Sequence, residues 1–294
     1  MATDEQTTDA GRLELPDVVV RILSNRKVLV ALSILVPMII IVALGERITP
    51  HDPLETDVAN RYGAPGGKYI LGTDHLGRDL LSRVILGGRS SLLLGFSATA
   101  VSLTAGIPIG LLAGYAKGRT DELLMRLMDI MMSIPVLLLG ILIVVSLGPS
   151  LFNVIIAIGI VYTPRIARVT RSATLSESEE PYVVAAKARG ESRSHILFRE
   201  ILPNVTGPII VEGSIRVGYA ILIGTSLSFL GLGAGPPTPD WGFMIATARE
   251  HMFSSMWFLI WPSLALVMSV TTMNLLGDGL RDVLDPKTEH GRTE

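Results

Sequence analysis

Long apolar segments separated by shorter polar ones dominate the pattern of this 294-residue sequence. A helix needs about 20 apolar residues to cross the hydrocarbon core of a bilayer. Six segments approach or meet that length: 28–45, 91–115, 128–148, 151–169, 205–231 and 256–279. They are continuously apolar and do not alternate with a period of two residues, which argues against a β-barrel. The pattern predicts an all-α, polytopic membrane protein with six transmembrane helices.

The first span reads as an uncleaved anchor, because it follows 27 mostly polar residues and lacks a convincing A-x-A cleavage site. The expected organisation is a cytoplasmic N-terminal segment, an anchor, an extracytoplasmic loop, a five-helix core that carries a polar loop at 176–204, and a cytoplasmic tail. These parts cover residues 1–27, 28–45, 46–90, 91–280 and 281–294.

Composition agrees with a membrane location. The chain is 49% hydrophobic and 18% charged, against roughly 25% charged residues in a soluble protein. Its net charge of -2 and its lack of a basic patch interleaved with aromatic residues argue against nucleic acid as a partner. The sequence contains no cysteine, which excludes disulfides, thiolate metal sites and a cysteine nucleophile.

Basic residues set the expected orientation, because Lys and Arg concentrate in the cytoplasmic loops of membrane proteins. With the N-terminus inside, 17 of the 25 Lys and Arg residues fall in segments on the cytoplasmic side. Both termini and the 176–204 loop are therefore expected in the cytoplasm.

Small residues and prolines shape the predicted spans. Gly106, Gly110 and Gly114 recur every four residues, a stripe that lets another helix approach closely. Prolines inside spans bend helices, and the neighbouring helices satisfy the freed backbone groups. Bends are expected at prolines 37, 108, 135, 208 and 262.

The 176–204 loop carries signals for two short helices. Pro181 suits a first helical turn and Gly190 suits the residue just past a helix end, which predicts a helix from about 181 to 189. Ser192 can cap a second helix, which Leu202-Pro203 is expected to stop. Its expected apolar edge consists of Ile196, Leu197 and Ile201.

The first of these helices is almost bare of bulky side chains on one side, where Ala185, Ala186 and Ala188 lie. Small side chains permit close backbone approach, so this helix suits a groove in another protein. The alternative is an amphipathic helix that lies on the lipid surface.

The order of small residues in this loop is similar to the EAA loop of permease subunits in bacterial ABC importers. Ala185-Ala186, Gly190 and Ile201-Leu202-Pro203 stand at the family spacing, whereas Val184 replaces the family glutamate. The stretches 72–84, 226–233 and 276–287 resemble signatures of the second permease subunit of dipeptide, oligopeptide and nickel importers. The similarity extends over most of residues 70–287.

This resemblance implies a type I ABC importer permease fold with a cytoplasmic coupling helix between transmembrane helices 4 and 5. It implies a second permease subunit, two cytoplasmic ATPases and an extracytoplasmic binding protein as partners, in a bacterial or archaeal plasma membrane. The residues expected to bind the ATPase and transmit its motion are Tyr182, Ala185, Ala186, Gly190, Leu202 and Pro203.

The chain itself is not expected to be an enzyme. It lacks a G-x-x-x-x-G-K-[ST] phosphate loop, so ATP and Mg²⁺ are expected in the partner ATPases and no cofactor in this chain. None of the five histidines lies three or four residues from another, and no metal site is predicted. The expected cargo is a dipeptide or oligopeptide. The alternatives are nickel or oligosaccharide cargo, or an ATP-independent channel or carrier.

Ionisable residues inside spans are costly and mark functional or structural pairs. Glu212 and Arg216 lie one helical turn apart and can pair with each other. A structural pair or a water-lined pathway explains these charges better than capture of substrate. Arg126 and Asp129 are expected to pair locally or to contact the 176–204 loop. The charges expected to order the C-terminal tail are Asp278, Arg281, Asp282 and Asp285.

The extracytoplasmic segments carry weaker signals. Arg78, Asp79 and Arg83 are expected to form local ion pairs in a folded loop. The proline-rich stretch 233–242 predicts a rigid loop without a helix. The three tryptophans, at positions 241, 257 and 261, are expected in an aromatic belt at the membrane interface.

Overall fold

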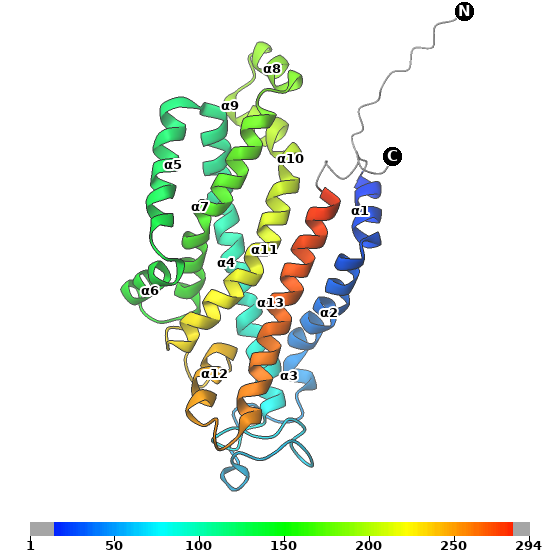
Figure 1. Ribbon diagram of the computed structural model, residues 1–294, viewed down its shortest axis with the longest axis vertical. Helices are drawn as coiled ribbons and strands as arrows, with labels where there is room; N and C mark the ends of the chain where they lie inside the picture. Colours follow the sequence, from blue (N-terminus) through cyan, green and yellow to red (C-terminus); the bar gives the residue numbers. More distant parts are fainter. Residues whose placement is uncertain (1–14, 285–294) are drawn as a thin grey trace, which may run out of the picture.

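The computed structural model describes residues 15–284, and every regular element of that part is helical. The helices form an elongated bundle (Figure 1). Their bounds are α1 Leu15–Ser24, α2 Arg26–Ala43, α3 Gly45–Ile48, η1 Val58–Asn60, α4 Leu80–Ala116, α5 Gly118–Ser133, α6 Val136–Leu147, α7 Leu151–Glu177, α8 Pro181–Ala188, α9 Arg193–His195, the π-helical segment η2 Ile196–Ile201, α10 Leu202–Asn204, α11 Thr206–Phe229, α12 Trp241–Glu250 and α13 Met256–Leu284.

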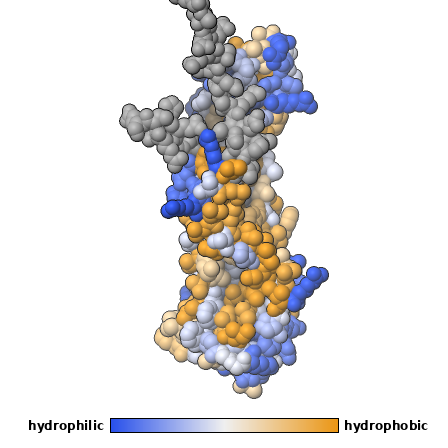
Figure 2. All heavy atoms as spheres, turned by 90° about the vertical axis from the view of Figure 1, so that its right-hand side faces the viewer, coloured by the Kyte–Doolittle hydropathy of each residue, from blue (hydrophilic) through white to orange (hydrophobic). Residues whose placement is uncertain are grey.

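Five of these helices, α2, α4, α7, α11 and α13, are long and apolar enough to cross a membrane. The bent pair α5 and α6 supplies a sixth crossing if it is taken as one span. On the face that carries α2 and α13, apolar side chains cover much of the middle and polar side chains gather toward the ends (Figure 2). The predicted all-α membrane architecture is confirmed.

The span expected over 128–148 is not a straight helix. The chain bends by 92° between α5 and α6, at Ile134 and Pro135. Proline disfavours helical backbone in the residue before it, and Ile134 is extended with φ −90° and ψ 130°. The proline therefore separates two helices, whereas Pro37, Pro108 and Pro262 lie inside continuous ones.

The closest helix packing joins α4 and α7 along the predicted glycine stripe. A Cβ atom added to Gly106 would lie 2.7 Å from Ile166 Cβ, and one added to Gly110 would lie 2.5 Å from the Ala167 carbonyl oxygen. At Gly114 it would meet Thr174 Cβ at 2.7 Å. These separations are too short for any side chain, so the stripe sets the distance between the two helices.

The N-terminal end of α4 is anchored by buried charges. The helix begins at Leu80, eleven residues before the predicted span, because Asp79 Oδ2 caps it by accepting the Ser82 amide proton at 3.0 Å. Asp74 Oδ2 lies 2.6 Å from Arg78 Nε and 3.5 Å from Arg83 Nε. The expected local ion pairing is confirmed for the two arginines, but their partner is Asp74, whereas Asp79 lies 3.6 Å from His51 Nδ1.

Two of the three tryptophans connect α4 and the segment before it to the later helices. Trp241 is buried, and its indole Nε1 donates to the Val84 carbonyl at 2.8 Å. Trp261 Nε1 donates to the Leu71 carbonyl at 3.0 Å. The prediction of a loop through residue 242 is also wrong at its end, because Asp240 caps α12 by accepting the Phe243 amide proton at 3.0 Å.

The C-terminal end of α13 meets the start of α2. Helix α13 continues to Leu284, so residues 281–284 of the expected tail are helical. Lys27 Nζ lies 2.8 Å from Asp282 Oδ2, which joins the start of α2 to the end of α13. Asp285 lies outside the described residues.

The glycine stripe predicts the sign of the change in Tm when glycine is replaced by alanine. Glycine in a helix interior ordinarily costs about 0.5–1 kcal/mol relative to alanine, so alanine should stabilise a roomy position. At Gly110 we expect the opposite, since the added Cβ meets backbone at 2.5 Å. Gly110→Ala should lower the Tm of the solubilised protein. Gly140→Ala is the matched control, because the nearest atom to its added Cβ would be Leu227 Cδ1 at 3.5 Å, an ordinary van der Waals distance. This substitution should leave the Tm unchanged or raise it. Equal Tm values for the two variants would contradict the packing argument.

Two histidines distant in sequence stack on each other, His75 from the segment before α4 and His251 from the end of α12. The His75 ring lies 5.1 Å from the His251 ring and 5.7 Å from the Phe258 ring. Tyr62 Oη lies 3.2 Å from His251 Nδ1. Burial lowers the pKa of His75 below its ordinary value of 6.5. The ring is therefore neutral in the folded loop at pH 7.

This burial predicts a pH dependence. The unfolded loop takes up a proton more readily than the folded one, so loop stability should be full above about pH 6.5 and fall as the pH drops below it. The hydrogen-exchange protection factors of residues 60–80, which correct for the pH dependence of the intrinsic exchange rate, should fall between about pH 6.5 and 5. His75→Phe should remove most of this loss of protection, since phenylalanine keeps a ring but cannot bind a proton. Acid sensitivity that persists undiminished in this variant would refute the role of His75.

Candidate functional site

The helix predicted in the 176–204 loop is present as α8. Pro181 occupies its first turn, and Gly190 follows its end with φ +76°. The Gly190 amide donates to the Lys187 carbonyl at 3.0 Å, and the Glu191 amide donates to the Ala186 carbonyl at 3.3 Å. This pair of bonds is the Schellman ending, in which glycine supplies the left-handed residue. The α8 prediction is confirmed.

The second helix of the loop continues where it was expected to stop. Ser192 Oγ accepts the His195 amide proton at 3.3 Å, as predicted for a cap. The backbone then passes through η2 and α10 into α11. Pro203 has no amide proton to donate, and a π-helical segment precedes it. Nearby, the Glu200 carbonyl accepts a hydrogen bond from Asn204 Nδ2 at 2.7 Å.

An apolar cluster fixes this loop to the membrane helices. The buried side chains of Val183 and Ala186 on α8 pack with residues of η2 and α11 and with Leu111 of α4. The remaining buried members of the cluster are Ile196, Leu197, Ile201, Val205 and Ile209. Because protein interiors are densely packed and resist deformation, α8 and these spans should move together.

Tyr182 adds a polar clasp to the cluster. Its hydroxyl donates to Glu177 Oε1 at 2.5 Å and accepts a hydrogen bond from Asn204 Nδ2 at 2.9 Å. Burial raises the pKa of Tyr182, and the hydrogen bond to Glu177 raises it further. The hydroxyl therefore keeps its proton, and one side chain links α7, α8 and α10.

The expected partner-binding residues fall into two groups. Ala185 and Gly190 are exposed, together with Val184 at 54% exposure and Ala188. Ala186 is fully buried, and Tyr182 and Leu202 are partly buried. We define the outward face of α8 as Val184, Ala185, Ala188 and Gly190. Val184, which stands at the position of the glutamate in the EAA loop, makes this face apolar.

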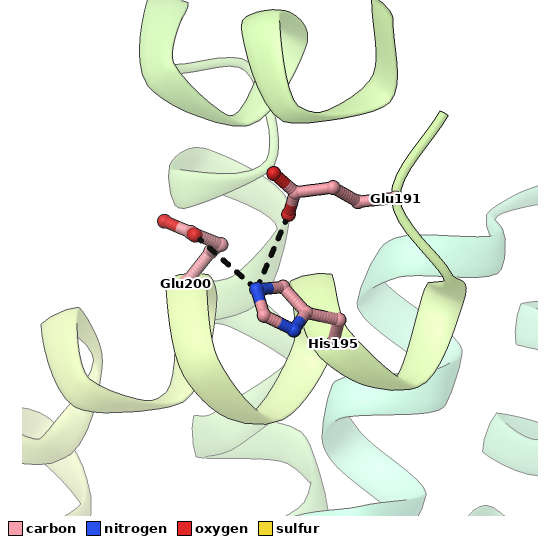
Figure 3. Close-up of side chains that lie close together, drawn as sticks. All are labelled: Glu191, His195 and Glu200. Atoms are coloured by element: carbon pink, nitrogen blue, oxygen red, sulfur yellow. Dashed lines mark ion pairs between the residues drawn. The ribbon is translucent and has the colours of Figure 1, made fainter. Parts of the chain in front are cut away.

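Three ionisable side chains meet beside α8 (Figure 3). His195 Nε2 lies 3.4 Å from Glu191 Oε2 and 3.8 Å from Glu200 Oε1. In an α-helix, residues 195 and 200 would point in different directions, and the intervening π-helical segment lets them meet. No sequence signal indicated this segment. One imidazole and two carboxylates can hold a cation, but a protonated His195 satisfies the same carboxylates, so the cluster alone defines no metal site.

The charge pair predicted inside the fifth span is present. Arg216 Nε lies 2.8 Å from Glu212 Oε1, and the two side chains are only 13% and 10% exposed. The Arg216 guanidinium also lies 4.7 Å from the Tyr219 ring centre and 5.5 Å from that of Tyr162. A third charged residue, which was not predicted from the sequence, belongs to this group. Arg165 of α7 lies within 3.6 Å of Glu212 Oε1.

The expected pairing of Arg126 with Asp129 is wrong. Arg126 binds Glu122 one turn earlier on α5, and Asp129 binds Arg168 of α7. Residues three apart on a helix can meet, but each of these side chains has a partner elsewhere. The Asp129–Arg168 pair and the pair between Arg171 and Asp121 attach α5 to α7.

A cavity of about 310 Å³ opens beside Glu212 among α7, α11 and α13. Charged and apolar side chains both line it. The lining residues are Val169, Gly207, Pro208, Val211, Glu212, Arg281 and Leu284.

Comparison with solved structures supports the fold. The chain resembles the structure titled "Inward facing conformations of the MetNI methionine ABC transporter" with a TM-score of 0.57. The two share 19% identity, and the alignment covers 68% of this chain and 96% of the other. At this level of identity the likeness bears on the fold alone.

Comparison with curated proteins gives much closer relatives. The di/tripeptide transport system permease protein DppC of Pseudomonas aeruginosa (strain UCBPP-PA14) is 46% identical over 249 residues, which are 83% of this chain and 82% of the relative. The dipeptide transport system permease protein DppC of Alkalihalophilus pseudofirmus is 42% identical, over 90% of this chain and 86% of the relative.

The sequence profile of binding-protein-dependent transport system inner membrane components matches residues 106–290. That region contains the 176–204 loop, the charge pair of α11 and the cavity. Together with the two relatives, this match confirms the resemblance inferred from the 176–204 loop. The chain is a multi-pass inner membrane protein and belongs to the family of binding-protein-dependent transport system inner membrane components.

Proposed function

We propose that this chain is one permease subunit of an ATP-driven importer of dipeptides or oligopeptides. The support is the 40–46% identity to relatives named as peptide permeases, which extends over most of the chain. A second permease subunit completes the translocation pathway, two ATPase subunits bind on the cytoplasmic side, and a binding protein delivers the peptide from outside.

The proposed orientation places both termini and α8 in the cytoplasm. The excess of Lys and Arg in the corresponding segments supports it. Helix α8, the start of α1 and the end of α13 lie at one end of the bundle, and the loop before α4 and helix α12 lie toward the other (Figure 1). A single orientation in the bilayer is therefore compatible with all of these elements.

The outward face of α8 carries the proposed link to the ATPase. Small side chains at Ala185, Ala188 and Gly190 let the α8 backbone approach a partner closely. The opposite side of α8 is held by the apolar cluster and by the Tyr182 clasp. A displacement of α8 by an ATPase is thus passed to α7 and α11 rather than absorbed in a loose loop.

In this proposal, the ATPase subunits bind and hydrolyse ATP, and the permease subunits form the pathway. This chain lacks the phosphate-binding loop motif, so ATP and Mg²⁺ are bound by the partner ATPases. When ATP closes the ATPase pair, the permease helices turn the pathway outward to accept peptide. Hydrolysis and release return it to the inward-facing state.

Reconstitution of the full set of partners tests the function. A dipeptide bound to its binding protein should stimulate ATP hydrolysis and accumulate inside proteoliposomes, whereas liposomes that contain this subunit alone should take up none. Uptake by the lone subunit would favour an ATP-independent carrier and overturn the proposal. Stimulation by nickel or an oligosaccharide, without stimulation by any peptide, would overturn the choice of cargo.

The outward face of α8 generates a separate prediction. Ala185→Trp places a bulky ring on this exposed face, so it should leave folding intact and lower peptide uptake and peptide-stimulated ATP hydrolysis at least tenfold, on the order of 1.4 kcal/mol or more of lost coupling. Ala185→Ser is the matched control and should behave as the wild type. Both should assemble with the outer binding protein normally. Wild-type uptake by the tryptophan variant would remove α8 from the coupling pathway.

A further inference from the structure

Three arginines are spaced three residues apart on α7, and they differ in how their charge is balanced. Arg168 pairs with Asp129, and Arg171 pairs with Asp121. Arg165 instead approaches Glu212 Oε1, at 3.6 Å. That oxygen already lies 2.8 Å from Arg216 Nε.

Two guanidinium groups therefore share one carboxylate. Glu212 is nine-tenths buried, and Arg216 is held between Tyr162 and Tyr219. Arg165, Glu212 and Arg216 together carry a net positive charge. The Arg216 side chain is locked by its aromatic neighbours and by Glu212, so Arg165 is the group that can present this charge to a ligand.

Arg165 lies within the predicted span 151–169, so its exposure is informative. It is about 21 Å along α7 from Leu151, at a rise of roughly 1.5 Å per residue, near the middle of the 27-residue helix. Its side chain is 54% exposed. A charged side chain that faces lipid inside a span is unfavourable, so such charges face a water-filled cavity or another protein group.

The cavity beside Glu212 lies next to this charge. Val169, which lines the cavity, is one helical turn from Arg165 on the same face of α7. Arg281 lines the cavity from α13. Its volume of about 310 Å³ lies at the lower end of the ~300–1,000 Å³ range of small-molecule pockets, which suits a short peptide better than a long one.

We propose that Arg165 binds a carboxylate of the peptide as it passes through the pathway, in a site whose geometry Glu212 and Arg216 maintain. This inference rests on the proposed function of peptide import. Every unmodified peptide carries a terminal carboxylate, and the planar guanidinium fork matches a carboxylate in a bidentate manner. Bound peptide would supply the negative charge that Arg165 and Arg216 do not both obtain from Glu212.

The lack of cysteine in this chain permits a test that alters the charge after folding. Arg165→Cys introduces the single thiol of this subunit, which can then be modified with a cationic or an anionic methanethiosulfonate. The transporter is reconstituted with its partners, and uptake of Ala-Glu, Ala-Ala and Ala-Lys is measured at saturating binding protein, with Ala-Ala amide as the control that lacks the terminal carboxylate. Unmutated transporter treated with the same reagents controls for thiols in the other subunits.

We expect the cysteine variant to lose uptake relative to wild type most for Ala-Glu and least for Ala-Lys. A charge-assisted hydrogen bond contributes about 1.5–3 kcal/mol, which corresponds to a change of roughly tenfold or more. The cationic reagent should restore uptake, and the anionic reagent should shift the preference toward Ala-Lys. Arg165→Lys, the conservative variant, should stay closer to wild type for all three peptides.

The outcomes separate this inference from the proposed function. Relative losses for the three peptides that are no larger than the loss for Ala-Ala amide, in an active transporter, would make Arg165 structural or a contact to the second permease and would overturn the inference. Failure of both reagents to reach the introduced thiol in the folded transporter would also overturn it. If the wild-type transporter imports none of the three peptides, the proposed function fails instead. Arg165→Gln, assayed with the same peptides, keeps the test decisive if the cysteine variant does not fold.

Discussion

The close approach of α4 and α7 is the constraint on which the rest of the structure depends. Three glycines on α4 leave no room for side chains against α7, so the two helices pack backbone to backbone. Helix α7 leads directly into α8, and Leu111 of α4 lies in the apolar cluster under α8. A loose α4–α7 contact would leave α8 without a fixed base, however well the 176–204 loop itself was folded.

Local sequence signals predicted the parts of the fold that depend on a few adjacent residues. The ends of α8 follow from Pro181 and Gly190, because proline and a left-handed glycine act within a single turn. The pairing of Glu212 with Arg216 likewise follows from one-turn spacing. These features needed no knowledge of which helices are neighbours.

Features that depend on tertiary neighbours could not be predicted in the same way. Trp241 resembles an interfacial aromatic in sequence, but α4 provides a carbonyl acceptor, that of Val84, and the ring is buried. Arg165 meets Glu212 only because α7 packs beside α11. The meeting of His195 with Glu200 requires a π-helical segment, for which the sequence offered no signal.

The two functional regions are connected by the same helices, and this connection has a mechanical consequence. Helices α7 and α11 carry Arg165, Glu212 and Arg216 in the membrane, and the same two helices flank the 176–204 loop. A shift of α8 that changes the relative position of α7 and α11 must change the 3.6 Å separation of Arg165 from Glu212, since each helix carries one partner. The pair within α11 is insensitive to such a shift because both residues belong to one helix. In the proposed mechanism, a motion of α8 would therefore alter how strongly Glu212 offsets the charge of Arg165, and hence how strongly that charge attracts a peptide carboxylate at each stage of the cycle.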